Sequence, residues 1–213
     1  PEPWVSHPDN IRNFYETGIT QNHNVAFTGG NATTSYRLGL GYSNQKGMIP
    51  FTDFQKFNVN VGATHKFSKK LRSQFSVKFN NSTSDNLPST GYDGANPIQQ
   101  SIWAGRQVDF SALKDWRNLP LALPGSGYGE GLVPINWNTA FQNNPYWQLE
   151  NNTNSFDRNR VIGNVGLVYD IFDFLSISGN MGVDNYTTKT SSRFAKGSGA
   201  DAPTYWRFSG DGN

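Results

Sequence analysis

The sequence predicts an all-β fold, an arc of a large antiparallel transmembrane β-barrel. Six segments alternate apolar and polar residues with the period of two that is typical of β-strands. Tight connections follow the first, third and fifth segments, and longer ones follow the others. Bacterial outer-membrane barrels have this layout, with short turns on one rim and long loops on the other. The expected strands are residues 20–30, 33–44, 54–67, 71–82, 158–170 and 175–186.

The third segment shows the alternation most clearly. Its apolar face, from Phe57 to Phe67, covers ten steps, which is about 33 Å along a strand. Tilted by about 40°, a strand of this length spans roughly 25 Å of height, the thickness of the apolar band of such barrels. The two aromatic residues then lie at the levels of the two membrane interfaces. The residues between them on this face are Val59, Val61, Ala63 and His65.

The strand count indicates that this wall is part of something larger. Open sheet edges are not tolerated in the hydrocarbon region, and single-chain bacterial barrels have at least about eight strands. We therefore expect the six strands to pair with others outside this chain. A soluble β-sandwich shows the same alternation with its apolar face inward. The polar residues in the middle of each strand and the alternating loop lengths favour the barrel.

A long insertion separates the fourth and fifth strands. The domain organisation we expect is a lead-in segment (1–19), four strands (20–82), an extracellular loop (83–157), two strands (158–186) and the start of another loop (187–213). Within the insertion, Asn96 is a plausible N-cap, Pro97 fits the first helical position and Gly105 fits the end of a short helix. A second short helix is expected at Ser111. Aromatic residues here either form a small core of their own or contact a substrate.

Composition excludes several classes of function. The net charge is +2 with scattered basic residues, so we expect no nucleic-acid partner. There is no cysteine, and the three histidines lack ligand spacing, so we expect no metal and no cofactor. No stretch approaches the roughly 20 apolar residues of a spanning helix. No G-x-S-x-G nucleophile elbow is present, and we expect no enzymatic activity.

Several stretches resemble the SusC/RagA family of TonB-dependent outer-membrane transporters. The matching blocks occur in the family's order and with its spacing, over nearly the whole chain up to about Tyr186. They are NIRNFYETG (10–18), QNHNV (21–25), GG (29–30), YRLGLGY (36–42), GMIP (47–50), GRQVD (105–109), NPYW (144–147) and RNRVIG (158–163).

The resemblance implies a location, a fold and partners. Family members are barrels of about 22 strands in the bacterial outer membrane. They are closed by a plug, lidded by a SusD-like surface lipoprotein and energised by TonB to import glycans or peptides. The chain shows no TonB box or plug, so contact with TonB would be made by an N-terminal part outside these residues. The expected partners are outer-membrane lipid, the SusD-like lipoprotein, TonB and a glycan or peptide substrate.

Two groups of residues are candidates for contact with a substrate or with the lid. The lumen candidates lie on the polar faces of the expected strands: Arg37, Asn58, Asn60, Gln74, Lys78, Asn164 and Asp184. The loop candidates are large or charged residues of the insertion: Trp103, Arg106, Asp109, Trp137, Tyr146 and Trp147. A passive surface glycan-binding or adhesin-type β-protein of the outer membrane is the alternative to a transporter.

Overall fold

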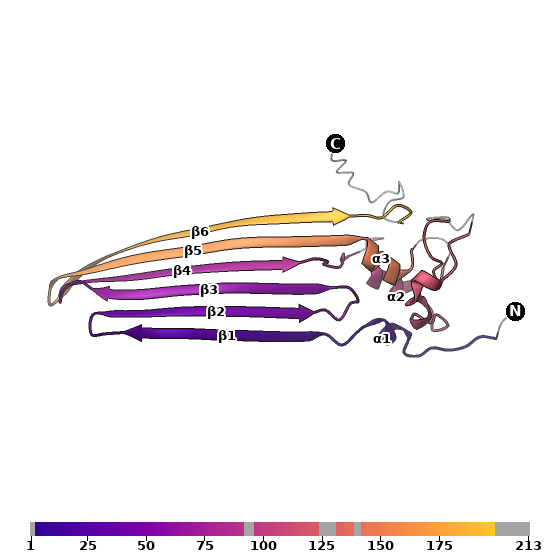
Figure 1. The fold of residues 1–213 in the computed structure, drawn as a ribbon, viewed down its shortest axis with the longest axis horizontal. Helices are drawn as coiled ribbons and strands as arrows, with labels where there is room; N and C mark the ends of the chain where they lie inside the picture. The colour runs from indigo at the N-terminus through magenta and orange to yellow at the C-terminus, as the bar shows by residue number, and fades with distance from the viewer. Residues whose placement is uncertain (1–2, 92–95, 124–130, 139–141, 199–213) are drawn as a thin grey trace, which may run out of the picture.

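The described residues form one six-stranded antiparallel sheet with a cluster of loops beyond one end. We call this end of the sheet its outer end. In the computed structural model, the described residues are 3–91, 96–123, 131–138 and 142–198. The strands lie side by side in chain order, from β1 to β6 (Figure 1). They are β1 (Ile19–Gly30), β2 (Thr34–Lys46), β3 (Asp53–Lys66), β4 (Leu71–Ser84), β5 (Thr153–Phe172) and β6 (Leu175–Arg193).

All six predicted strands are present, but β5 and β6 are longer than the sequence predicted. They stay paired from Phe172 and Leu175 out to Thr153 and Arg193. The prediction ended at Arg158 and Tyr186 because the apolar alternation stops there. Residues 187–193 belong to β6 rather than to a loop. Backbone pairing continues along segments rich in Thr and Ser. Thr favours strands, but a segment of polar residues shows no apolar alternation from which a strand could be predicted.

The tight turns are stabilised by single side chains. Between β1 and β2, the Asn31 Oδ1 atom accepts hydrogen bonds from the backbone N–H groups of Thr33 (2.9 Å) and Thr34 (2.8 Å). Between β3 and β4, the Ser68 hydroxyl accepts from Leu71 N–H in the same manner. The connection after β2 was predicted to be long, but it covers only residues 47–52. Strands β2 and β3 extend further toward it than the apolar pattern indicated.

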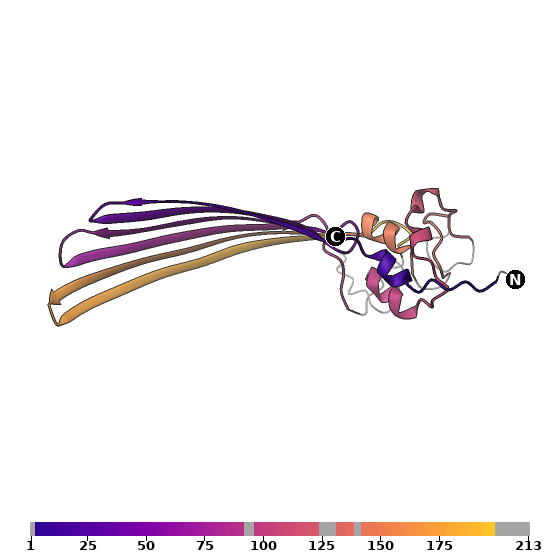
Figure 2. The same ribbon diagram turned by 90° about the horizontal axis from the view of Figure 1, so that it is seen from below.

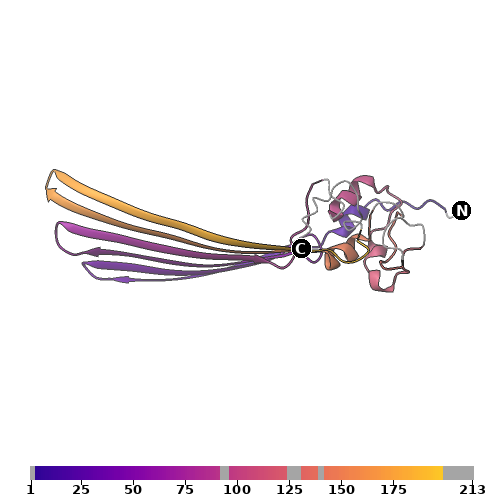
Figure 3. The same ribbon diagram turned by 90° about the horizontal axis from the view of Figure 1, so that it is seen from above.

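The loop region lies beyond the end of the sheet opposite these tight turns (Figures 2 and 3). Its helices are α1 (Asn10–Phe14), α2 (Gln100–Trp103) and α3 (Pro145–Asn151), with 3₁₀ turns at Pro97–Gln99, Ser111–Leu113 and Trp116–Asn118. Its core combines the segment before β1 with the insertion after β4. The buried residues of this core are Phe14, Val108, Phe110, Leu113, Tyr146 and Leu149.

Asparagine caps begin two of these helical segments. The Asn96 side chain accepts from Ile98 N–H at 3.0 Å with Pro97 following, which confirms the predicted cap. Helix α3 begins in the same way at Asn144, and the sequence analysis missed it although the Asn-Pro signature is identical. Among the described residues, no helix is long and apolar enough to span a membrane.

Candidate functional site: the polar face and the loop region

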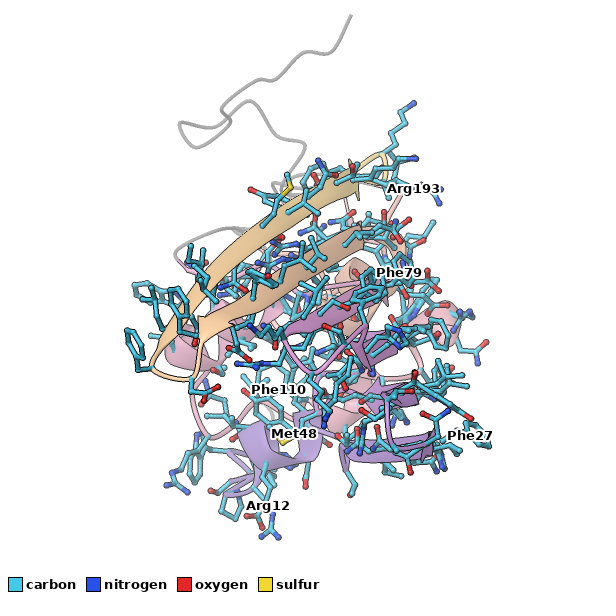
Figure 4. The ribbon with its side chains drawn as sticks, turned by 90° about the vertical axis from the view of Figure 1, so that its left-hand side faces the viewer. Arg12, Phe27, Met48, Phe79, Phe110 and Arg193 are labelled. Carbon is cyan, nitrogen blue, oxygen red and sulfur yellow. The ribbon has the colours of Figure 1, made fainter. Side chains whose placement is uncertain are left out.

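The sheet has one apolar and one polar face. Residues opposite each other in antiparallel strands share a face, so the pairing registers extend each face across all six strands. One apolar row consists of Phe27, Leu38, Val61, Val77, Gly163 and Val183. Phe27 and Phe79 project from the same side of the sheet in Figure 4. Charged residues of the described strands reach this face only near the outer end, at Lys46, Asp53, Asp157, Lys189 and Arg193.

The seven lumen candidates all lie on the polar face. The registers connect Arg37 to Gly62, Ser76, Asn164 and Gly182 in one row across β2 to β6. The other candidates lie at even steps along the same strands, so they share this face. These residues are Asn58, Asn60, Gln74, Lys78 and Asp184. Their contact with a substrate remains a prediction.

Two glycines let amide side chains lie flat on the polar face. A Cβ atom at Gly41 would come within 2.5 Å of Asn58 Oδ1 and 2.7 Å of Asn24 Oδ1. A Cβ atom at Gly166 would come within 2.4 Å of Asn180 Oδ1. The missing side chains give these amides room across neighbouring strands. The polar face therefore presents a layer of hydrogen-bonding amides in addition to its charges.

Both carboxylates on this face are paired. Asp184 accepts from the Arg160 guanidinium through both of its oxygens, with 2.8 Å between Oδ1 and Nε. Asp170 accepts from Arg72 Nη1 at 2.6 Å. Of the candidate residues, Asp184 is therefore already engaged by the protein. The sequence analysis did not identify Arg160 as the partner of Asp184, or Arg72 as the partner of Asp170, because cross-strand pairing depends on register.

Three loop candidates have accessible side chains. Trp103 of α2 is 59% exposed, next to Ile102, which is 74% exposed. Arg106 is exposed, and its backbone carbonyl accepts from His7 N–H at 2.7 Å. Asp109 is half-buried and accepts from Ser111 N–H at 2.9 Å. The bond to the Ser111 side chain lowers the pKa of Asp109, against a smaller opposing effect of its burial.

The structure corrects the expectation for the other three aromatic candidates. Tyr146 and Trp147 of α3 are 1% and 6% exposed, so neither ring presents a surface to a substrate. Tyr146 belongs to the loop core, and Trp147 belongs to a second buried cluster with Ala122 and Val133. Burial raises the pKa of the Tyr146 hydroxyl to about 12, with further contributions from Glu16 and Asp109. Trp137 packs against the same core and donates through its indole N–H to Gln100 Oε1 at 3.1 Å.

Buried amides connect the segments of the loop region, and sequence reasoning did not identify them. Gln100 donates to the carbonyl of Asn143 at 2.7 Å and accepts from Asn136 and Trp137. Asn86 donates to the carbonyls of Phe51 (3.2 Å) and Leu149 (2.7 Å). From sequence alone, such residues are assigned to surface loops, because Asn and Gln side chains are mostly exposed in proteins. Only their three-dimensional partners distinguish them.

A charge cluster attaches the lead-in segment to both the sheet and the insertion. The Glu16 carboxylate lies 2.8 Å from Lys46 Nζ, at the end of β2, and 3.3 Å from Lys114 Nζ in the insertion. The hydrogen bond with Lys46 is the main cause of a lowered pKa at Glu16, opposed by burial and reinforced by Lys114. In the described part of the chain, no group of three or more metal-ligating side chains comes together.

Comparison with known proteins supports the predicted relationship. No family model matches the sequence. The chain is 27% identical over 142 residues to the TonB-dependent receptor SusC of Bacteroides thetaiotaomicron. That match includes 66% of this chain and 13% of SusC. In fold it is similar to a chain of the RagAB peptide importer in the closed-closed state, with a TM-score of 0.58 and 16% identity, over 87% of this chain and 20% of that one.

The chain therefore spans less than a quarter of the length of either of these two proteins. The six-stranded open sheet is what such a length of a transporter's barrel provides, since the wall closes only when all strands are present. The motifs, the sheet and both comparisons agree: the chain is similar to part of the barrel of SusC/RagA-type TonB-dependent transporters.

Proposed function

We propose that the chain forms part of the barrel wall of an outer-membrane transporter that imports glycans or peptides. The observation that carries the proposal is the two-faced sheet: the apolar face has no charged residue below its outer end, and the polar face carries charges along its whole length. Lipid requires the first property, and a water-filled lumen allows the second. The similarity to a TonB-dependent receptor and to a peptide importer agrees with this assignment.

In this arrangement the tight turns face the periplasm and the loop region faces the outside of the cell. A SusD-like lipoprotein would cover the outer end, and the exposed α2 residues Ile102 and Trp103 are the strongest candidates for contact with it. TonB would act through parts of the protein outside these strands. The amide layer over Gly41 and Gly166 would then line the path of the substrate.

Uptake by intact cells tests the proposal. Cells producing the full-length protein, and cells lacking its gene, are given fluorescent oligosaccharide and oligopeptide mixtures with and without a protonophore. A transporter should accumulate one of the mixtures inside the cell, and both the protonophore and loss of the gene should abolish this accumulation. Label that stays on the cell surface and is insensitive to the protonophore would instead indicate a passive adhesin.

A further inference from the structure

The polar face carries an excess of positive charge. Its strand positions hold seven cationic residues and two carboxylates, and both carboxylates are paired to arginines. The remaining five cations have no carboxylate of a described residue within 4.0 Å. We name them the cationic track: Arg37, Lys56, Lys66, Lys78 and Arg158.

The cationic track runs along the whole polar face. Lys56 and Arg158 both face Ser82 near the outer end. Lys78 lies opposite Asn60 and Arg37 opposite Gly62, further along β3, and Lys66 lies near the tight-turn end. The ten steps from Lys56 to Lys66 cover about 33 Å along β3, and successive positions of the track along this direction are at most about 13 Å apart. This spacing is close to the Debye length of about 10 Å at 0.1 M salt, so neighbouring positions act on a common ligand.

The apolar face shows that this charge is not a property of the whole sheet. Its charged residues are confined to the outer end and include both signs. Rows of Lys and Arg side chains in a pore select anions, and a low-dielectric wall concentrates their field in the lumen. Amides beside the track supply neutral hydrogen bonds to the rest of a ligand.

We infer that the substrate is a linear chain bearing several carboxylate or sulfate groups, and that the cationic track guides it through the lumen. The inference rests on the proposed function and specifies its substrate class. Carboxylates can come from an acidic glycan or an acidic peptide, and the chemistry of the track is the same for both. Arg158 already stacks on Tyr186 at 4.5 Å, which holds its guanidinium in place on the polar face.

Binding to the purified full-length protein tests the inference. The probes are oligogalacturonate and a glutamate-rich peptide, each compared with a neutral counterpart of equal length, a maltooligosaccharide and a glycine–serine peptide. We expect at least one anionic probe to bind about tenfold or more tightly than its neutral counterpart. The preference should shrink between about 50 mM and 500 mM salt. The stronger anionic probe identifies the source of the carboxylates.

A triple variant assigns the effect to the track. R37Q, K56Q and K78Q together should weaken binding of the anionic probe by about tenfold. The control variant K69Q also removes a positive charge, but in the β3–β4 turn, away from the polar face. It should bind the anionic probe as tightly as the parent protein does. Thermal unfolding of the variants establishes that the barrel is intact.

Equal binding of charged and neutral probes, or unchanged binding in the triple variant, would overturn the inference. Failure of the proposed function has a different signature, since energised uptake would then be absent altogether. Protonophore-sensitive uptake of a neutral probe, with no preference for the anionic one, would support the transporter function and exclude an anionic substrate.

Discussion

Asn144 shows how much one buried amide determines in the loop region. It is fully buried at the start of α3, and its Oδ1 atom accepts from the N–H groups of Tyr146 (3.0 Å) and Trp147 (3.2 Å). Its Nδ2 group donates to the carbonyl of Leu113 at 3.0 Å. The same side chain therefore caps a helix and attaches it to the 3₁₀ turn at Ser111–Leu113. A buried group with every partner satisfied is costly to replace.

The N144A substitution should loosen the loop region without disturbing the sheet. It removes both capping bonds and leaves a buried carbonyl unpaired, at a cost of about 1–3 kcal/mol. Hydrogen exchange of α3 amides in the full-length protein measures the effect. The N118A control removes an exposed amide whose bond is to nearby Asp115, and it should change little. Equal protection in both variants would contradict the anchoring role of Asn144.

The two faces of β3 make opposite predictions for the same substitution. Val61 lies between Leu38 and Val77 on the apolar face, whereas Asn60 lies between Gly39 and Lys78 on the polar face. An arginine facing lipid near mid-bilayer costs about 2–4 kcal/mol. V61R should therefore destabilise the full-length barrel by about this amount in lipid vesicles.

The N60R substitution is the matched control, because it places the same side chain one residue away in a wet lumen. Repulsion from Lys78 is its main cost, and screening by water and salt in the lumen should keep that cost below about 1 kcal/mol. Urea unfolding of both variants in lipid gives the comparison. A greater loss of stability in N60R than in V61R would reverse the assignment of the two faces.

At the scale of elements, the sheet was more predictable than the loop region. Strands such as β3 alternate with period two, and this alternation is visible in the sequence. Register then follows from the apolar residues and the short turns. The loop core instead joins Phe14 to Phe110 and Tyr146, with ring centroids 6.0 and 5.3 Å apart, across long separations in the chain. No local pattern predicts such contacts, so the sequence left open whether Tyr146 and Trp147 form a core or contact a substrate.

Elements of the loop region are also connected by charge, which predicts a pH dependence. The pKa of Glu16 is below its reference value of 4.5, chiefly because of Lys46. A carboxyl with a lowered folded-state pKa stabilises the fold above its unfolded pKa, and this stabilisation is lost as pH falls through the folded value. Exposed pairs of this kind contribute up to about 1 kcal/mol each. Protection of residues 10–16 from hydrogen exchange, corrected for the intrinsic rate, should therefore decrease as pH falls from 7 to well below 4.5.

The E16Q variant separates this effect from general acid unfolding. Its protection at residues 10–16 should be lower than that of the parent at pH 7, and the difference should shrink as pH falls below 4.5 and the parent carboxyl becomes protonated. A difference between the two proteins that persists at low pH would show that packing, and not charge, attaches the lead-in segment.

At the scale of the whole molecule, two features are unfavourable for a sheet that stands alone in water. Its sheet ends in the edge strands β1 and β6, and an apolar face extends across all six strands. Met181 and Val183 of β6 are 71% and 59% exposed. Further strands would complete the edges, and lipid would cover the face. The barrel wall proposed above, in the outer membrane with its loop region outside, would meet both requirements.

Single cysteines test this orientation directly, because the chain contains none of its own. S101C places a thiol in α2 of the loop region, and K69C places one in the β3–β4 turn. In intact cells producing the full-length protein, a membrane-impermeant maleimide should label S101C and spare K69C. Disrupting the outer membrane should then make K69C reactive, and the protein without either substitution gives the background. Labelling of K69C in intact cells, with S101C protected, would place the loop region in the periplasm and invert the proposed barrel.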